Sequence, residues 1–132
     1  KNASGFKLTS YVSHDLVPLY LVAADMLVLP YTTGMTIRGG TVATDFTSPI
    51  KLFEYMASGR PIVATSLPSV RELLRDGENA VLVPPDSEDA LYGGISLVLR
   101  DRELAARISS GALSEVRGYT WEERVKKLLG FK

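Results

Sequence analysis

Apolar residues along this chain gather in three short runs, each bounded by proline or by polar residues. Runs of this kind are typical of buried strands in a parallel sheet. The predicted strands are Met26–Leu29, which ends before Pro30, then Pro61–Thr65, and Ala80–Val83, which ends before Pro84. An earlier segment, Phe6–Val12, alternates between apolar and polar residues and predicts a further strand.

Helix start and stop signals separate these strands. Ser48 precedes Pro49 at the start of one predicted helix, and Gly59 follows its end. Ser13 is the predicted cap of a helix from His14 to about Ala24, and a short helix is predicted at the capping-box spacing that starts with Ser69. Three more helices are predicted after the last strand: from about Ser87 to Leu99, from Asp101 to about Arg117, and from Thr120 onward. Strands that alternate with helices predict one α/β domain whose parallel sheet is covered on both faces.

The composition narrows the classes of function. The chain has 132 residues, about one domain, and its 15 basic and 15 acidic residues give zero net charge. A protein without excess positive charge is not expected to bind nucleic acid. The lack of cysteine rules out disulfides and thiolate metal sites, and no apolar run approaches the roughly 20 residues that span a bilayer. The one histidine, His14, is interpreted as a solvated residue at a helix start.

The helix predicted at Ser48 starts where a ligand site is expected. Ligands of open α/β sheets bind beyond the carboxyl ends of the strands, where the long predicted loop Tyr31–Thr47 also lies. The first N–H groups of a helix lack intrahelical partners, so Thr47, Ser48 and Lys51 predict a phosphate site. Glu54 follows Ser48 by six residues, about 9 Å along the axis, which suits the ribose of the same nucleotide.

Two simpler interpretations stay open when these residues are considered alone. Ser-Pro at a helix start is common and needs no ligand. Lys51 and Glu54 are three positions apart, so they also suit an ordinary surface ion pair worth about 0.2–0.5 kcal/mol.

The segment Ser48–Ala64, SPIKLFEYMASGRPIVA, resembles the signature segment of family-four retaining glycosyltransferases of GT-B fold, the glycosyl transferases group 1. Other segments are similar to the same family in the same order: Val17–Asp25, Leu27–Tyr31, Arg71–Leu74, Asp76–Asn79, Leu82–Pro85 and Tyr119–Glu122. The resemblance implies a Rossmann-like sheet with helices on both faces, forming the later half of the C-terminal, donor-binding domain. It also implies binding of a nucleoside-diphosphate sugar and, in the full enzyme, transfer of the sugar with retention of anomeric configuration and without a metal.

The same resemblance implies roles for residues of this chain by position. The diphosphate turn is formed by Thr47, Ser48, Pro49, Ile50 and Lys51, the ribose is held by Glu54, and Tyr11, Val12 and Ser13 lie beside the base. Phe46 stands where the family's paired-glutamate motif has its first glutamate, and the adjacent Asp45 is the candidate to contact the sugar hydroxyls instead. The resemblance gives this chain no catalytic residue and no metal ligand.

Partners and location are implied as well. The donor is expected to be a UDP-, GDP- or ADP-sugar, and the acceptor a sugar or a lipid-linked molecule held by an N-terminal domain that this chain lacks. The full-length enzyme is expected in the cytoplasm, at the inner face of the membrane. Because Phe46 replaces a glutamate, a noncatalytic module that binds a nucleotide sugar stays open as a second interpretation.

The resemblance also implies that part of the sheet is missing. The family's C-terminal domain begins with two strand–helix units, and neither is present before Phe6. Phe6–Val12 is then the third strand in the order 3-2-1-4-5-6, separated from Met26–Pro30 by a gap of two strands. We expect the open strand edges to favour self-association, and the chain alone not to transfer sugar.

Overall fold

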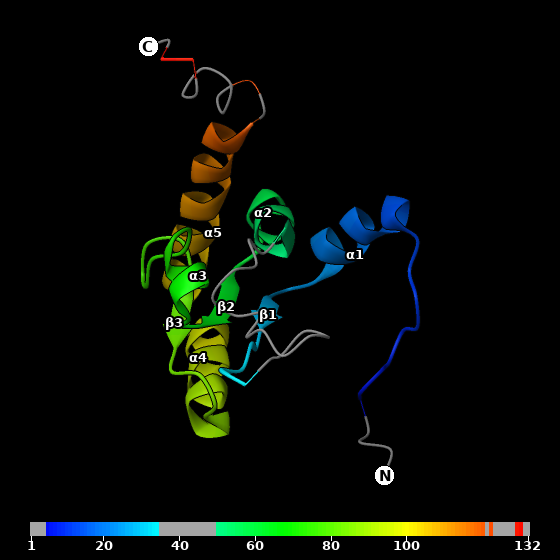
Figure 1. Cartoon of the computed structure of the whole chain (residues 1–132). Coiled ribbons are helices and arrows are strands. Elements are labelled where there is room, and N and C mark those ends of the chain that lie inside the picture. Colours follow the sequence, from blue (N-terminus) through cyan, green and yellow to red (C-terminus); the bar gives the residue numbers. More distant parts are fainter. Residues whose placement is uncertain (1–4, 35–49, 121, 123–128, 131–132) are drawn as a thin grey trace.

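The computed structural model describes residues 5–34, 50–120, 122 and 129–130. At its centre lies a parallel sheet of three strands, β1 (Leu27–Leu29), β2 (Ile62–Thr65) and β3 (Val81–Val83), in the order β1-β2-β3 (Figure 1). These are the three strands that the apolar runs predict. Each crossover places the carboxyl ends of the strands at the same edge of the sheet.

Helices connect and follow the strands, and most begin and end where the sequence predicts. The helices are α1 (Val17–Ala23), which follows the 3₁₀ turn η1 (His14–Leu16), α2 (Ile50–Ala57), α3 (Pro68–Arg71), α4 (Glu88–Arg100), α5 (Arg102–Val116) and the 3₁₀ turn η3 (Arg117–Tyr119). Ser87 caps α4 by accepting a hydrogen bond from the backbone N–H of Ala90, and Asp101 caps α5 in the same way from Leu104. Gly59, just past the end of α2, has φ of +69°, which suits a glycine at a helix end.

One predicted cap is wrong, and another lacks its side-chain hydrogen bond. The short third helix begins at Pro68 with Leu67 as its N-cap, so Ser69 lies inside the helix. The fixed φ of a proline suits the first turn of a helix, which explains the earlier start. Ser13 is the N-cap of η1, but its side chain makes no capping hydrogen bond.

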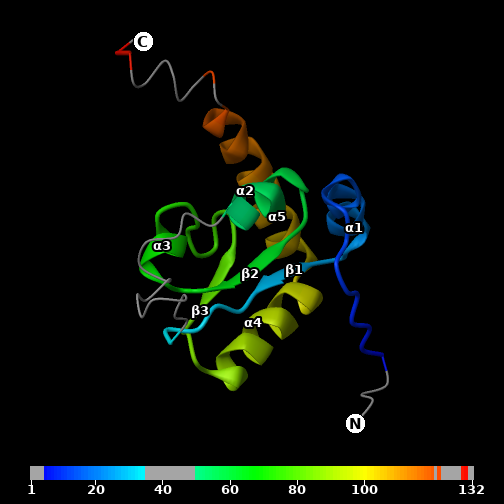
Figure 2. The same cartoon turned by 45° about the vertical axis from the view of Figure 1, so that its right-hand side comes forward.

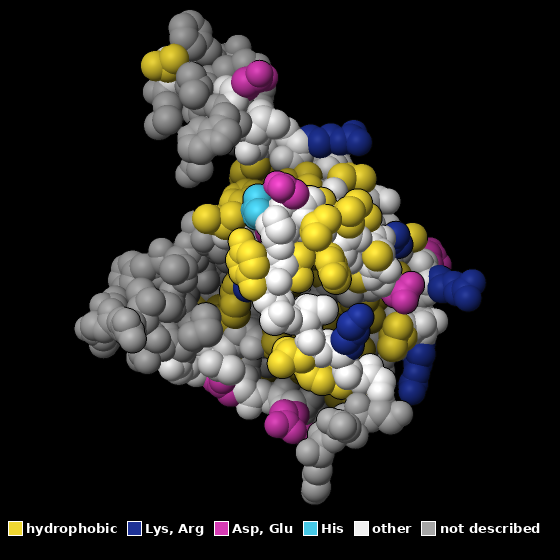
Figure 3. Space-filling model, turned by 90° about the vertical axis from the view of Figure 1, so that its right-hand side faces the viewer, with side chains coloured by type: hydrophobic (Ala, Val, Ile, Leu, Met, Phe, Trp, Pro, Cys, Tyr) yellow, Lys and Arg dark blue, Asp and Glu magenta, His cyan; other side chains and the backbone are white. Residues whose placement is uncertain are grey.

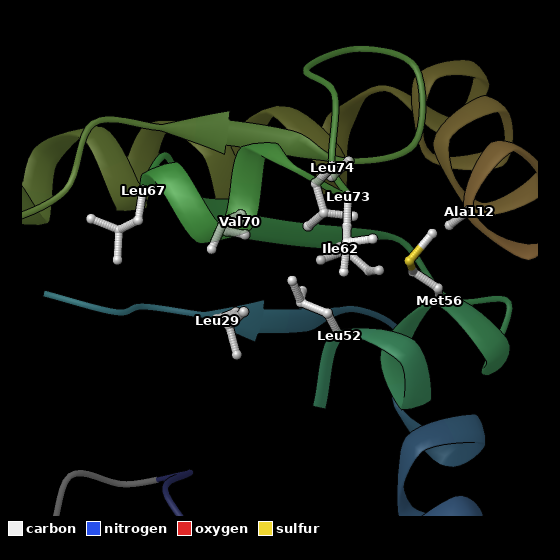
Figure 4. Packing of buried hydrophobic residues seen from close by; sticks show 11 residues of the cluster. Leu29, Leu52, Met56, Ile62, Leu67, Val70, Leu73, Leu74 and Ala112 are labelled. Atoms are coloured by element: carbon white, nitrogen blue, oxygen red, sulfur yellow. The ribbon is translucent and has the colours of Figure 1, made fainter. Parts of the chain in front are cut away.

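One face of the sheet packs on α2, α3 and α5. Leu52 and Met56 of α2 meet Leu29 and Ile62 of the sheet, and all four side chains are buried (Figure 4). The same cluster also holds Val70 of α3 and Ala112 of α5. The register explains this arrangement, because Leu29 pairs with Ala64 and paired residues of parallel strands share a face.

The other face packs on α4 and the first half of α5. Val63, Val81 and Val83 project to this side and form a cluster with Val98 of α4 and Ile108 of α5. Figure 2 shows α4 and α2 on opposite faces of the sheet, which confirms the predicted cover on both faces. All four residues of β2 are therefore buried.

Phe6–Val12 forms no strand, so that prediction is wrong. Phe6, Leu8 and Tyr11 are 76%, 83% and 91% exposed, and the segment runs away from the sheet toward the N-terminus (Figure 1). An alternating pattern gives a stable strand only when a neighbouring strand supplies hydrogen bonds. Among the described residues no strand pairs with the free edge of β1.

Three further predictions fall largely outside the described residues. They are the loop Tyr31–Thr47 beyond Gly34, the helix start at Ser48 and Pro49, and the helix predicted from Thr120.

Substitutions at two adjacent glycines of α4 test how closely this helix packs against the sheet. A Cβ at Gly94 would lie 2.7 Å from Cγ1 of Val83 and 3.1 Å from Cγ1 of Val63, whereas a Cβ at Gly93 meets nothing within 4 Å. We expect Gly94→Ala to destabilise the protein by about 1–3 kcal/mol because it overpacks the core. Gly93→Ala should stabilise it by about 0.5–1 kcal/mol, since alanine is the better helix former. Denaturant unfolding of both variants measures the difference, and equal effects would contradict the packing described here.

Candidate functional site

Three loops meet at the carboxyl edge of the sheet, and hydrogen bonds tie them together. The hydroxyl of Thr65, the last residue of β2, donates to the carbonyl oxygen of Tyr31 at 2.8 Å. The backbone N–H of Ser66 donates to the carbonyl oxygen of Val83 at 2.8 Å. The end of β2 is thus fastened to the loop after β1 and to the end of β3.

A fourth contact joins the two outer loops directly. The carboxylate of Asp86, after β3, accepts hydrogen bonds from the backbone N–H of Thr33, at 3.3 Å, and from the Thr33 hydroxyl. Asp86 has φ of +58°, in the left-handed region that residues with a side chain rarely adopt. Sequence reasoning did not single out this pair, because nothing local links positions 33 and 86.

Helix α2 begins at this same edge, because it starts after the carboxyl end of β1 and leads to the start of β2. Its first described turn exposes Ile50, which is 74% exposed, and Lys51, while Leu52 is buried in the core. A cation in the first turn is unfavourable for the helix alone, and an anion bound there would offset this. Of the five residues predicted to bind the diphosphate, Ile50 and Lys51 lie within the described part of the chain.

The remaining predictions for the site divide into two groups. Thr47, Ser48, Pro49, Asp45 and Phe46 lie outside the described residues. Tyr11 and Ser13 are exposed and Val12 is partly buried, and all three directly precede η1.

Glu54 lies on α2 with its side chain 32% exposed. Its Oε1 lies 3.9 Å from Nε2 of His14, which η1 places beside it. The structure gives no ion pair between Glu54 and Lys51, so the simple surface pair is not formed. The His14 side chain is 85% exposed at the start of η1, as predicted for a solvated residue at a helix start, and the segment of Tyr11, Val12 and Ser13 directly precedes it.

A small apolar cavity of about 210 Å³ lies between α1 and α2, and Glu54 is one of its lining residues. The others are Val17, Pro18, Leu21, Val22, Ala57 and Ser58. Arg60 donates to the carbonyl oxygen of Val22, which holds the end of α1 near the start of β2. Figure 3, which looks at this side of the molecule, shows hydrophobic side chains gathered around the histidine.

Tyr55 connects α2 to the loop after β1. Burial raises the pKa of its phenol, and the nearby Tyr31 and Glu54 raise this pKa further. Tyr31 also packs against the apolar cluster that contains Leu52. The loop after β1 and the helix that carries Lys51 and Glu54 are therefore neighbours through their side chains.

A broader, open hollow of about 720 Å³ lies beside α3 and β3. Most of its charged groups already have partners, although Arg71 makes only a hydrogen bond to Ser66, at 3.4 Å. Arg75 lies 2.7 Å from the carboxylates of both Glu78 and Glu115. Asp76 accepts a hydrogen bond from the backbone N–H of Leu82 at 2.9 Å. Because Arg75, Glu78 and Asp76 already have partners within the protein, the start of α2, where Lys51 is exposed, is the stronger candidate site.

Two other kinds of feature are absent from the described residues. No group of three or more His, Cys, Asp or Glu side chains among them is arranged to hold a metal ion. None of their helices is long and apolar enough to cross a membrane.

The sequence over residues 1–101 matches the protein family described as glycosyl transferases group 1. Among curated proteins, the phosphatidyl-myo-inositol mannosyltransferase of Mycobacterium leprae (strain TN) is 40% identical over 72 residues, 54% of this chain and 19% of that protein. The chitobiosyldiphosphodolichol beta-mannosyltransferase of Debaryomyces hansenii is 24% identical over 127 residues, 92% of this chain and 25% of that protein. The chain thus spans about a fifth to a quarter of the length of these relatives.

Solved structures with a similar fold include the C-terminal domain of a glycosyl transferase group 1 family protein (LpcC) from Francisella tularensis. Its TM-score is 0.69 at 20% identity, over 86% of this chain and 53% of that chain. Anabaena Alr3699/HepE, solved in complex with UDP and glucose, has a TM-score of 0.66 at 21% identity, over 86% of this chain and 29% of that chain. At such identities the likeness concerns the fold, and it confirms the predicted fold class.

Alkaline titration tests the surroundings of Tyr55. The pKa of the Tyr55 phenol is raised in the folded protein, so this phenol loses its proton at a lower pH in the unfolded chain. The free energy of unfolding therefore falls as the pH rises above about 10. We expect Tyr55→Phe to make the free energy of unfolding fall less steeply with pH in this range. Tyr92→Phe, at a side chain that is 70% exposed, is the matched control and should keep the wild-type slope. Identical slopes for wild type and Tyr55→Phe would contradict the assignment.

Proposed function

Because the chain belongs to the glycosyl transferases group 1 family, we propose that it binds a nucleoside-diphosphate sugar at the carboxyl edge of its sheet. The observation that carries this proposal is the start of α2. There the exposed Lys51 and the partly exposed Glu54 follow one another along one helix and form no pair with each other. The Lys51 ammonium and the Glu54 carboxylate therefore do not neutralise each other.

The positions of these two residues suit the two polar parts of one nucleotide. The helix dipole and the Lys51 ammonium both favour the diphosphate at the helix start. Glu54 is three residues farther, about 4.5 Å along the axis, where its carboxylate accepts hydrogen bonds from ribose hydroxyls. The base would then lie toward Tyr11, Val12 and Ser13, on the side of Glu54 where His14 lies.

In the complete protein the sugar would pass from the diphosphate to an acceptor with retention of anomeric configuration. The bond between the anomeric carbon and the diphosphate breaks, and a bond forms between that carbon and a hydroxyl oxygen of the acceptor, which loses its proton. Negative charge develops on the leaving diphosphate. Backbone N–H groups at the helix start and Lys51 stabilise that charge, and we propose that no metal is needed. Full activity in the presence of a metal chelator is the expected result.

The acceptor is proposed to be a sugar or a lipid-linked molecule bound by a further domain. Two relatives are named for phosphatidyl-myo-inositol and for a diphosphodolichol, which supports a lipid-linked acceptor. We propose that the complete protein acts at the cytoplasmic face of a membrane.

We further propose that other residues of the same domain cover α1 and the free edge of β1. Helix α1 has no buried residue although all seven of its residues are apolar or tyrosine, and Leu19 and Tyr20 are 61% and 54% exposed. About half of the solved domain from Francisella tularensis has no counterpart in this chain. The chain alone would then transfer no sugar, and at high concentration it would associate with itself through these surfaces.

The second candidate function is a noncatalytic module that binds a nucleotide sugar. It is favoured by Phe46, which stands where the family motif has a glutamate. A transfer assay on the complete protein distinguishes the two, since only the enzyme releases free nucleoside diphosphate in proportion to the acceptor glycosylated.

Charge reversal at the helix start tests the diphosphate site. We expect Lys51→Glu to weaken UDP or GDP binding by about tenfold or more, the scale of charge-assisted hydrogen bonds. Arg102→Glu makes the same charge change in the first turn of α5 and should leave the affinity unchanged. Calorimetric titration measures both variants, and equal affinities for Lys51→Glu and wild type would place the diphosphate elsewhere.

The ribose contact is tested with a modified ligand. Glu54→Ala should lose about 1.5–3 kcal/mol of nucleotide binding, and the wild type should bind a 2′,3′-dideoxy nucleotide about as weakly as this variant binds the normal one. The variant should no longer distinguish the two ligands. If it distinguishes them as well as wild type does, Glu54 does not hold the ribose.

A further inference from the structure

We propose that Asp86 is a positioning residue for the nucleotide site, which holds the loop after β1, residues 30–34, through Thr33. The inference rests on the proposed function, because it assigns this loop a part in binding the diphosphate at the carboxyl edge. Asp86 itself touches no ligand in this proposal. Its contribution is to keep the loop in the conformation that the nucleotide needs.

The backbone of Asp86 is the first argument. Among the described residues it is the only non-glycine residue with positive φ, at +58°. Aspartate adopts this conformation more readily than most residues with a Cβ, but the conformation still costs more free energy than it would for glycine and is kept where the surrounding structure supports it. A glycine would adopt it without strain, so the side chain must account for the use of aspartate here.

The carboxylate of Asp86 supplies that reason. It accepts hydrogen bonds from both the backbone N–H and the hydroxyl of Thr33, a residue 53 positions away in the sequence. Two residues earlier, the carbonyl oxygen of Tyr31 accepts from the Thr65 hydroxyl at 2.8 Å. The loop is therefore fixed at two points, one from the end of β2 and one from the loop after β3.

The fixed loop is also next to the helix that carries the proposed contacts. Tyr31 packs against the cluster that contains Leu52, and it lies near Tyr55, beside Glu54. A loop that is already ordered in the free protein loses less entropy when a ligand binds. Loss of the Asp86 contact should therefore weaken nucleotide binding even though the nucleotide contacts are unchanged.

Two variants of Asp86 separate positioning from mere stability. Asp86→Gly removes the carboxylate and also relieves the backbone strain, so the overall stability should stay close to that of wild type. Asp86→Asn keeps an acceptor for the Thr33 N–H and tolerates the left-handed conformation. We measure the affinity for UDP and GDP by calorimetry and the hydrogen exchange of the Thr33 amide by NMR.

In Asp86→Gly we expect faster exchange of the Thr33 amide and nucleotide binding weakened about two- to tenfold, the effect of one or two lost hydrogen bonds. Asp86→Asn should remain within about twofold of wild type in both measurements. Thr33→Val should weaken binding less than Asp86→Gly, and adding it to Asp86→Gly should cause no further loss, because the two residues act through one contact.

Three results would overturn the inference. Unchanged exchange at Thr33 in Asp86→Gly would show that the contact does not hold the loop. Faster exchange with unchanged affinity would show that the contact is structural only. If wild type binds neither nucleotide, the proposed function fails and the positioning role fails with it, while the exchange data still report on the contact itself.

Discussion

The burial of β2 on both faces is the constraint on which the rest of the structure depends. All four of its residues are buried, with Ile62 and Ala64 packed on the side of α2 and Val63 on the side of α4. A strand covered on both faces leaves no freedom of register, because a shift of one residue would exchange the two sets of side chains. The positions of β1 and β3, and of the loops that follow them, are set by this strand.

The candidate site follows from that arrangement. Since all three strands are parallel, their carboxyl ends lie together, and the polar residues that follow them can be joined across β2. Thr65, the last residue of β2, makes one of these connections, and Asp86 with Thr33 makes the other. Helix α2 starts at the same edge because Leu52 and Met56 anchor its other side in the core. Packing therefore decides where Lys51 and Glu54 are presented.

Local patterns were enough to predict the features that depend on local chemistry. The apolar runs gave the three strands, and Ser87 and Asp101 marked the starts of α4 and α5 because capping involves residues three positions apart. Phe6–Val12 was predicted wrongly because a strand requires a partner that the pattern itself cannot supply. The contacts of His14 with Glu54 and of Asp86 with Thr33 were missed for a related reason. They join residues 40 and 53 positions apart, which only the fold brings together.

We propose that a nucleoside diphosphate binds at the carboxyl edge of the sheet, at the start of α2. An NMR titration of the isotope-labelled protein with UDP and GDP, following each backbone amide, tests it most directly. Binding at this edge should cause saturable shifts at Lys51, Glu54 and the loop Tyr31–Gly34, with little change at Arg60 and Met26 on the opposite edge. Shifts confined to that opposite edge or to the hollow around Arg75, or no shifts with either nucleotide, would contradict it.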